Sequence, residues 1–186
     1  MVPPRRLFFA LQPTAAMRQR LRDCAPAALR KGRRVPADNL HLTLHFLGNC
    51  GEEQEARLRR LASCVRAPAG QITLSRLTVW PGPRVQVAES WGGRVPVWLK
   101  VLHGAVAEGL RADGFPLESR TYRPHVTLAR KCPPHEDVRI APVCLQFRDF
   151  VLMASESGAE GVSYRVIGRW SLRPSGRGAR LSADMG

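Results

Sequence analysis

Short segments that alternate between apolar and polar positions recur along the chain, separated by turns rich in Pro and Gly. Residues 6–11, R-L-F-F-A-L, form a short run rich in aromatic and aliphatic residues, which predicts a strand, and residues 40–47 alternate as L-H-L-T-L-H-F-L. A period of two is typical of a strand with one face in the core. Further segments of this kind predict strands at residues 71–80, 84–89, 125–129, 144–153 and 164–172.

Three other segments have helical periodicity, at residues 14–29, 52–65 and 97–112. The last of these places Trp98, Leu102 and Leu110 on one apolar face, and Pro26 is expected to kink or end the first helix early. Strands interleaved with few helices and joined by Pro/Gly turns predict an α+β fold with a mainly antiparallel sheet.

A chain of 186 residues corresponds to one domain, or to two small lobes. Its longest unbroken apolar runs, such as residues 7–11 and 150–154, have five residues, whereas a membrane span needs about 20. We therefore expect no membrane helix and no signal peptide. Residues 1–172 are predicted to form one folded domain, and the polar, basic residues 173–186 are expected to form a mobile tail.

The chain is strongly basic, with 29 Lys and Arg against 15 Asp and Glu and a formal net charge of +14. Such a charge favours a polyanionic partner, most simply nucleic acid or a phosphate ester. An alternative is compositional, because Arg greatly outnumbers Lys and a GC-rich coding sequence would give the same bias. The five scattered cysteines form no C-x-x-C motif, so we expect free thiols in the cytoplasm and neither disulfides nor a zinc site.

One four-residue motif occurs twice, as His41-Leu42-Thr43-Leu44 and as His125-Val126-Thr127-Leu128. Random order of this composition would give only about 0.2 His-x-Thr triplets, so the pair is a strong signal. Positions i and i+2 of a strand share a face and lie about 6.6 Å apart. Two such strands side by side would present two imidazoles and two hydroxyls to one cleft.

This set of side chains suits phosphodiester chemistry. One imidazole can act as base on the attacking oxygen and the other as acid on the leaving oxygen, since both titrate near neutral pH. Thr43 and Thr127 can donate hydrogen bonds to phosphate oxygens, and the guanidinium of Arg130, just beyond the second motif, can neutralise their charge. The chain has no Walker, Rossmann, H-E-x-x-H or G-x-S-x-G motif, so no metal or cofactor is expected.

His45 invites a metal hypothesis, because strict alternation would place it on the same face as His41. Positions i and i+4 of a strand lie about 13 Å apart, too far for one metal ion to bind both. We therefore interpret His45 as structural, or as a residue that supports the side chains of the site without binding the substrate.

The paired motifs resemble those of the 2H phosphoesterase superfamily, and in particular its bacterial and archaeal RNA 2',3'-cyclic phosphodiesterases, historically called 2'-5' RNA ligases. The resemblance rests on residues 6–11, 39–48, 123–130 and 164–170 and covers about residues 5–172. It implies two pseudo-symmetric lobes of antiparallel sheet backed by helices, with the active-site cleft between them.

The resemblance also implies an activity and roles for single residues. Members open a terminal 2',3'-cyclic phosphate of RNA to a 2'-phosphomonoester without a metal. His41 would be the proton donor and His125 the proton acceptor, with Thr43, Thr127 and Arg130 binding the phosphate. An aromatic residue of the first strand is expected to stack on the terminal base, with Phe9 as first choice and Phe8 as the alternative.

Other functions stay open at this point. The reverse reaction, 2'-5' ligation, would use the same residues, and a small nucleotide cyclic phosphate could replace RNA as substrate. A non-catalytic RNA-binding module would explain the charge but not two intact histidine motifs. The expected partner is RNA with a 2',3'-cyclic phosphate end, and we expect the protein to act as a monomer.

Overall fold

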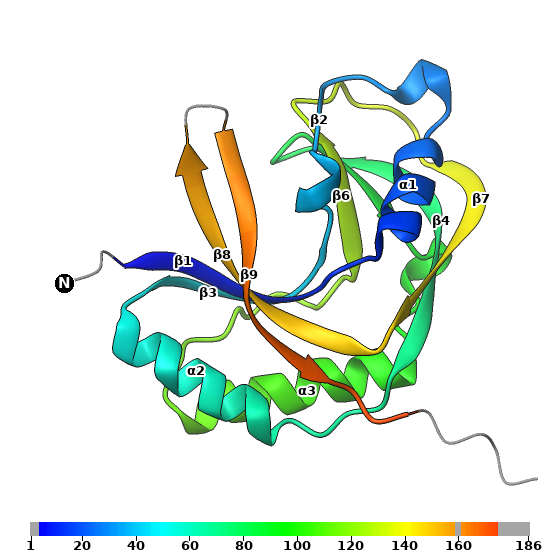
Figure 1. Ribbon diagram of the computed structural model, residues 1–186. Coiled ribbons are helices and arrows are strands. Elements are labelled where there is room, and N and C mark those ends of the chain that lie inside the picture. Colours follow the sequence, from blue (N-terminus) through cyan, green and yellow to red (C-terminus); the bar gives the residue numbers. More distant parts are fainter. Residues whose placement is uncertain (1–3, 159–160, 175–186) are drawn as a thin grey trace, which may run out of the picture.

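The structure, a computed structural model, describes residues 4–158 and 161–174. Three α-helices, three short 3-10 helices and nine strands follow one another along this part of the chain (Figure 1). In order these are β1 (Arg5–Leu11), α1 (Ala15–Asp23), η1 (Ala27–Leu29), β2 (Arg33–Arg34), η2 (Ala37–Asn39), β3 (Leu42–Cys50), α2 (Glu52–Cys64), β4 (Gly70–Trp80), β5 (Val85–Glu89), η3 (Trp91–Gly93), α3 (Val97–Ala112), β6 (His125–Arg130), β7 (Val138–Phe147), β8 (Asp149–Gly158) and β9 (Gly161–Ser171).

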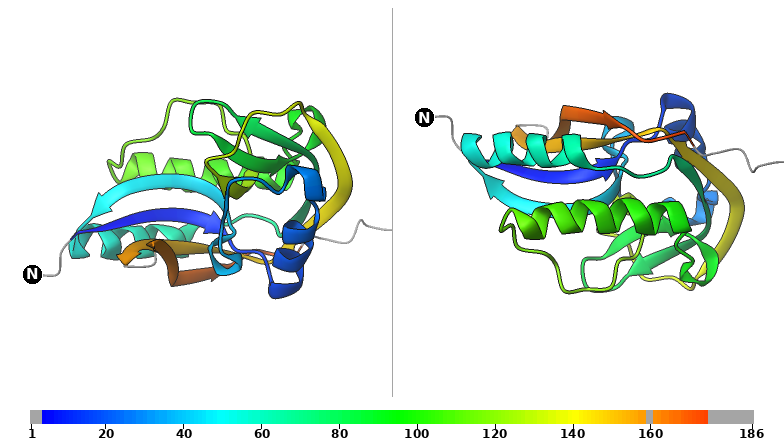
Figure 2. Two further views of the ribbon diagram at one scale, coloured as in Figure 1. Left: turned by 90° about the horizontal axis from the view of Figure 1, so that it is seen from above. Right: turned by 90° about the horizontal axis from the view of Figure 1, so that it is seen from below.

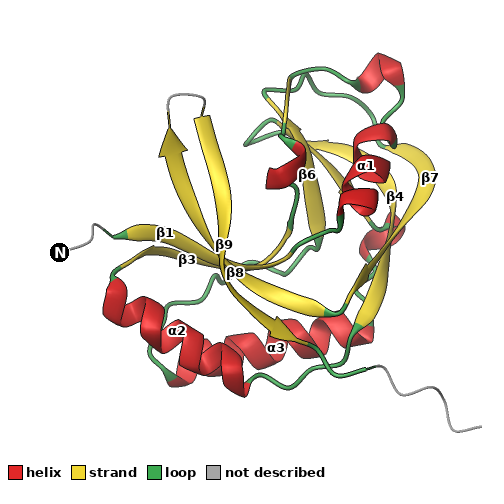
Figure 3. Cartoon of the chain, viewed as in Figure 1, coloured by secondary structure: helices red, strands yellow, loops and turns green. Residues whose placement is uncertain are grey.

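The strands form two antiparallel halves. The order β3-β1-β8-β9 makes what we call the first lobe, and β6-β5-β4-β7 makes the second lobe. The halves meet where β3 pairs with β6 through Leu42 and Val126, so the two sheets are joined into one strongly bent sheet (Figure 3). The predicted α+β fold with two lobes is confirmed, and the two His-x-Thr motifs lie on the two strands at the junction.

One predicted strand proves to be two. The segment predicted as a strand over residues 144–153 is interrupted at Arg148, where β7 ends and β8 begins. β7 pairs with β4 in the second lobe, whereas β8 pairs with β1 in the first. The chain therefore crosses between the lobes at Arg148, a change of partner that a continuous apolar pattern does not reveal.

Helices α2 and α3 lie side by side on the convex side of the bent sheet, while β2 lies on the opposite side (Figures 1 and 2). α3 buries Leu99, Leu102, Val106 and Leu110 at helical spacing. The two helices approach closely at Gly109, where an added Cβ would lie 2.8 Å from the Leu61 side chain. Within the described residues, none of the helices is long and apolar enough to cross a bilayer.

The ends of the elements mostly follow the predicted signals. α1 begins at the cap residue Thr14, whose hydroxyl accepts from the Met17 amide, and ends before Pro26. Arg173, which follows the predicted domain boundary at residue 172, still makes backbone hydrogen bonds to the fold, because its amide donates to the Ala67 carbonyl and its carbonyl accepts from the Ala69 amide. Most of the predicted tail, residues 175–186, lies outside the described residues.

Candidate active site

The two histidine motifs form a near-symmetric square at the junction of the lobes. Leu42 is directly opposite Val126 in an antiparallel pair. One residue further each way, this register brings His41 opposite Thr127 and Thr43 opposite His125. Directly opposed Cβ atoms lie about 5 Å apart and diagonal ones about 7–8 Å. The two imidazoles therefore occupy one diagonal of the square and the two threonines the other.

The square is part of the wall of an open cleft with a volume of about 530 Å³. The cleft lies between the β8–β9 hairpin of the first lobe and β2 with β6 of the second (Figure 1). The phosphate-binding and catalytic residues predicted from sequence, namely His41, Thr43, His125, Thr127 and Arg130, all line this cleft. No Asp, Glu or Cys is among the described residues that line it.

Each motif carries a β-bulge at its Leu. On β1, Phe9 pairs with His45 and Ala10 with Thr43, so Leu44 has no partner. On β5, Gln86 pairs with Ala129 and Val87 with Thr127, so Leu128 is unpaired in the same way. An extra residue reverses the alternation beyond it. The two copies of the motif therefore share a β-bulge as well as a sequence.

The bulges decide which side chains reach the cleft. Beyond Leu44, Phe46 faces the cleft, while His45 turns to the opposite face and stacks on His103 of α3 with ring centroids 4.0 Å apart. Beyond Leu128, Arg130 faces the cleft and Ala129 is buried. The expectation that His45 shares the face of His41 is therefore wrong, although its structural interpretation agrees with this packing. Arg130 reaches the cleft because of the bulge.

Both histidines are oriented by the same hydrogen bond. His41 Nδ1 lies 2.7 Å from the carbonyl of Asn39, and His125 Nδ1 lies 2.7 Å from the carbonyl of Arg123. A carbonyl only accepts, so each Nδ1 must carry the proton. This leaves both Nε2 atoms free to exchange protons with a ligand.

The two residues that supply these carbonyls are held in different ways. The Asn39 side chain donates to the Val162 carbonyl at 2.7 Å and accepts from the Tyr164 amide at 3.0 Å, which ties His41 to β9. Arg123 instead makes an ion pair with Glu89 at 3.1 Å. Glu89 is only 3% exposed and also pairs with Arg76 at 3.2 Å.

Aromatic rings pack against both imidazoles. His41 lies between Phe8 and Tyr164, with ring centroids 4.8 and 5.0 Å away, and Trp80 packs on His125 at 4.2 Å. Burial lowers the pKa of His41 to about 4, assisted by the positive charges of His125 and Arg130. Burial lowers the pKa of His125 as well, while the Glu89 carboxylate acts in the opposite direction. Both imidazoles are therefore mainly neutral at pH 7, and the pKa of His41 lies below the near-neutral value expected from the sequence.

The assignment of a base-stacking role to Phe9 is wrong. Phe9 is 0% exposed and packs in the main core against Phe150 and Trp170. Phe8, on the other face of β1, lines the cleft, but its ring is buried beneath His41 and Tyr164. The exposed aromatic ring at the cleft is Phe46, which is 44% exposed.

Sequence reasoning missed three arginines of the cleft. Arg6 lies on β1, and Arg33 with Arg34 forms the short strand β2, which pairs with β6. The only signal in the sequence was a pair of adjacent arginines in a segment not predicted to be a strand. With Arg130 they make the cleft strongly electropositive.

Comparisons with known proteins agree with this geometry. Residues 11–87, which include the first motif, match the family model described as LigT like phosphoesterase. The RNA 2',3'-cyclic phosphodiesterase of Escherichia coli K12 is 34% identical over 92% of this chain and 99% of its own. The crystal structure of apo E. coli LigT superposes with a TM-score of 0.78 at 31% identity, covering 92% of this chain and 99% of that one. E. coli LigT complexed with 3'-AMP gives 0.76 at 32% identity, covering 91% and 98%.

The bilobal sheet with a His-x-Thr motif on each central strand defines a two-histidine phosphoesterase. More specifically, the chain belongs to the LigT-like phosphoesterase family, a branch of the 2H phosphoesterases.

Proposed function

We propose that this protein is an RNA 2',3'-cyclic phosphodiesterase that opens a terminal cyclic phosphate to a 2'-phosphomonoester. The observation that carries the proposal is the His–Thr square, in which both Nε2 atoms are free beside one electropositive cleft. The RNA 2',3'-cyclic phosphodiesterase of E. coli, which is similar to this protein over nearly the whole chain, supports the proposal.

In the proposed reaction, His125 Nε2 takes a proton from water as its oxygen attacks phosphorus. The bond from phosphorus to the 3'-oxygen breaks, and His41 Nε2 donates its proton to that oxygen. The hydroxyls of Thr43 and Thr127 and the guanidinium of Arg130 bind the non-bridging oxygens. Two imidazoles complete both proton transfers, so the proposed steps route through neither a metal nor a cofactor.

His41 must be protonated to act as donor, although its pKa in the empty cleft is about 4. An anionic phosphate placed against Nε2 raises the pKa of an imidazole by favouring its charged form. Substrate binding is therefore expected to bring a proton to His41, so that the acid forms only with its phosphate in place.

Other features support the remaining parts of the proposal. Phe46 offers an exposed ring at the cleft for the terminal base. Both histidine motifs lie in one chain, so one copy completes the site and a monomer suffices. All five cysteines are free thiols, which suits a reducing cytoplasm.

The test is hydrolysis of an oligoribonucleotide with a 2',3'-cyclic phosphate end in the presence of a chelator. We expect a 2'-phosphomonoester as the sole product, identified by end-group analysis. An intact cyclic end after long incubation, with salt-dependent RNA binding, would instead indicate a non-catalytic RNA-binding module. Joined 2'-5' products in the presence of a 5'-hydroxyl acceptor would show the reverse reaction at the same site.

Glu89 provides a test of which histidine is the base. The carboxylate of Glu89 raises the pKa of His125, so Glu89→Gln is expected to lower that pKa further. A base works when deprotonated, and the acidic limb of the kcat profile, which reports the substrate complex, should therefore move to lower pH. The measurement is the pH–rate profile of folded Glu89→Gln, compared with Glu108→Gln, which removes an exposed carboxylate from α3.

The direction of the shift is decisive. If the basic limb moves to lower pH instead, His125 is the acid and the two roles are exchanged. If neither limb moves, the Glu89 charge does not act on a catalytic histidine.

A further inference from the structure

The cleft extends beyond the His–Thr square along β2, where the sheet places like charges side by side. Arg33 on β2 is directly opposite Arg130 on β6. Side chains at such positions have Cβ atoms about 5 Å apart, and like charges there destabilise the pair. Within the described residues, neither guanidinium has an acidic partner. The fold thus maintains a repulsion that a bound anion would relieve.

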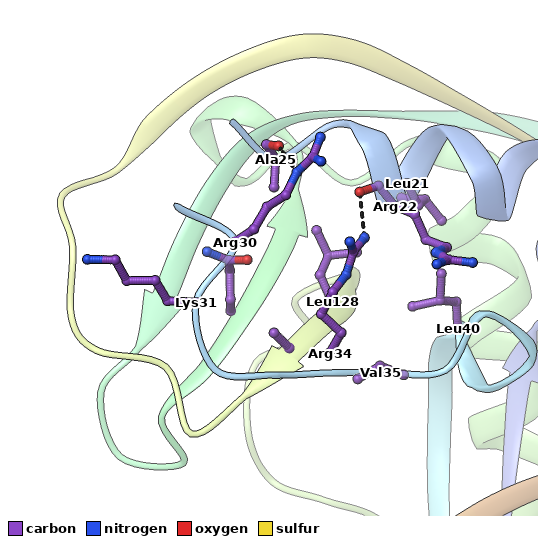
Figure 4. A pocket seen from close by; sticks show the side chains of 11 residues that line it. Leu21, Arg22, Ala25, Arg30, Lys31, Arg34, Val35, Leu40 and Leu128 are labelled. Carbon is purple, nitrogen blue, oxygen red and sulfur yellow. Dashed lines mark hydrogen bonds between the residues drawn. The ribbon is translucent and has the colours of Figure 1, made fainter. Parts of the chain in front are cut away.

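The next arginine along β2 is held in place by the backbone. Arg34 donates through a terminal guanidinium nitrogen to the carbonyl of Arg22 at 2.7 Å, at the end of α1 (Figure 4). Behind it, Arg30 is fixed in the same manner, donating to the Ala25 carbonyl at 2.8 Å. Neutral carbonyls orient these cations without cancelling their charge.

Within the described residues, Arg34 forms no ion pair either. The small hollow beside it, about 10 Å³ in volume, is too small for a ligand and has Arg22, Arg30 and Lys31 at its rim (Figure 4). No Asp or Glu is among the described residues lining this hollow or the cleft. Arg33 therefore lies beside Arg130 on the cleft side of the sheet, whereas Arg34 lies opposite the buried Ala129 and its guanidinium turns to the end of α1.

We infer that Arg33 forms a second phosphate subsite, which binds the phosphodiester immediately upstream of the cyclic end, while Arg34 adds to the positive charge around it. This inference rests on the proposed function, since it takes the reacting phosphate to lie on the His–Thr square. Arg130 serves that reacting phosphate, so the cross-strand neighbour Arg33 meets the next anion of the strand. The substrate class is then an RNA strand of at least two nucleotides, distinguished from a mononucleoside cyclic phosphate by its first internal phosphate.

The experiment compares two substrates, adenosine 2',3'-cyclic phosphate and the dinucleotide ApA with a 2',3'-cyclic phosphate end. The measured quantity is the ratio of their kcat/KM values. Arg33→Gln is expected to lower the dinucleotide-to-mononucleotide ratio about tenfold and to reduce the salt slope of dinucleotide binding by about one, whereas Arg34→Gln should lower the ratio less. The control is Arg60→Gln, which removes an equal charge from an exposed position on α2 and should keep the wild-type ratio.

A third substrate isolates the charge of the internal linkage. Replacing that linkage with an uncharged methylphosphonate should lower the wild-type kcat/KM about as much as Arg33→Gln does. The two changes together should cost little more than either alone, because both remove the same ion pair. Additive losses would show that Arg33 acts elsewhere.

The outcomes separate this inference from the proposed function. A ratio unchanged by Arg33→Gln, or equal losses on both substrates, overturns the second subsite while leaving cyclic phosphate hydrolysis intact. Failure of the wild-type protein to hydrolyse either substrate overturns the proposed function itself.

Discussion

Replacing either His41 or His125 with alanine is expected to lower kcat/KM for cyclic phosphate hydrolysis by at least about 10²-fold. Each imidazole presents a free Nε2 to the cleft, and each proton transfer needs one of them. The loss should fall mainly on kcat, because proton transfer occurs in the transition state and not in the bound ground state.

The two variants should not be additive. Residues that act as a unit in one step give a double variant little slower than the worse single one. The measurement is steady-state kinetics of both single variants and the double variant on the same cyclic-phosphate oligonucleotide. His135→Ala is the control, since His135 lies on an exposed loop outside the cleft. Wild-type turnover of either single variant would remove that histidine from the mechanism.

The sequence was sufficient to predict the centre of the site. The duplicated His-x-Thr motif required only that two strands become neighbours, and the pairing of Leu42 with Val126 fulfils this. The helix over residues 97–112 was predicted to the residue, because its apolar stripe is long and regular.

Features set by pairing between distant strands could not be predicted in the same way. A bulge leaves the local sequence pattern intact and reverses the facing of the residues beyond it, so strict alternation placed His45 beside His41. The corresponding bulge at Leu128 brings Arg130 to the cleft face. In the sequence, only the position of Arg130 just after the second motif indicated a role in the site.

The error at Phe9 has a related cause. Residues 7–11 are all apolar, so alternation gives no sign of which face is the core. Only the packing of Phe9 on Phe150 and Trp170 decides it, and both partners lie more than 140 residues away. Likewise, nothing local marks Arg33 and Arg34 as a strand, because β2 has two residues and depends on β6 for its hydrogen bonds.

The second large effect is expected from Arg130→Gln, which should lower kcat/KM about 10²- to 10³-fold, the cost typical of losing one preorganised donor to a developing charge. Arg130→Lys should recover part of the loss, because an ammonium restores the charge but not the bidentate geometry. A purely structural role predicts a loss of stability. The fold predicts no loss of stability, because removing the charge of Arg130 relieves its repulsion with Arg33.

Thermal unfolding therefore has to be measured beside the kinetics. We expect Arg130→Gln to unfold at or slightly above the wild-type temperature while losing activity. Its charge also lowers the pKa of His41, so the variant should move the limb of the pH–rate profile that belongs to His41 to higher pH. Arg60→Gln again supplies the matched control on α2. Unchanged kcat/KM in Arg130→Gln would leave the phosphate to Thr43 and Thr127 alone, and a lowered unfolding temperature would make Arg130 a structural residue.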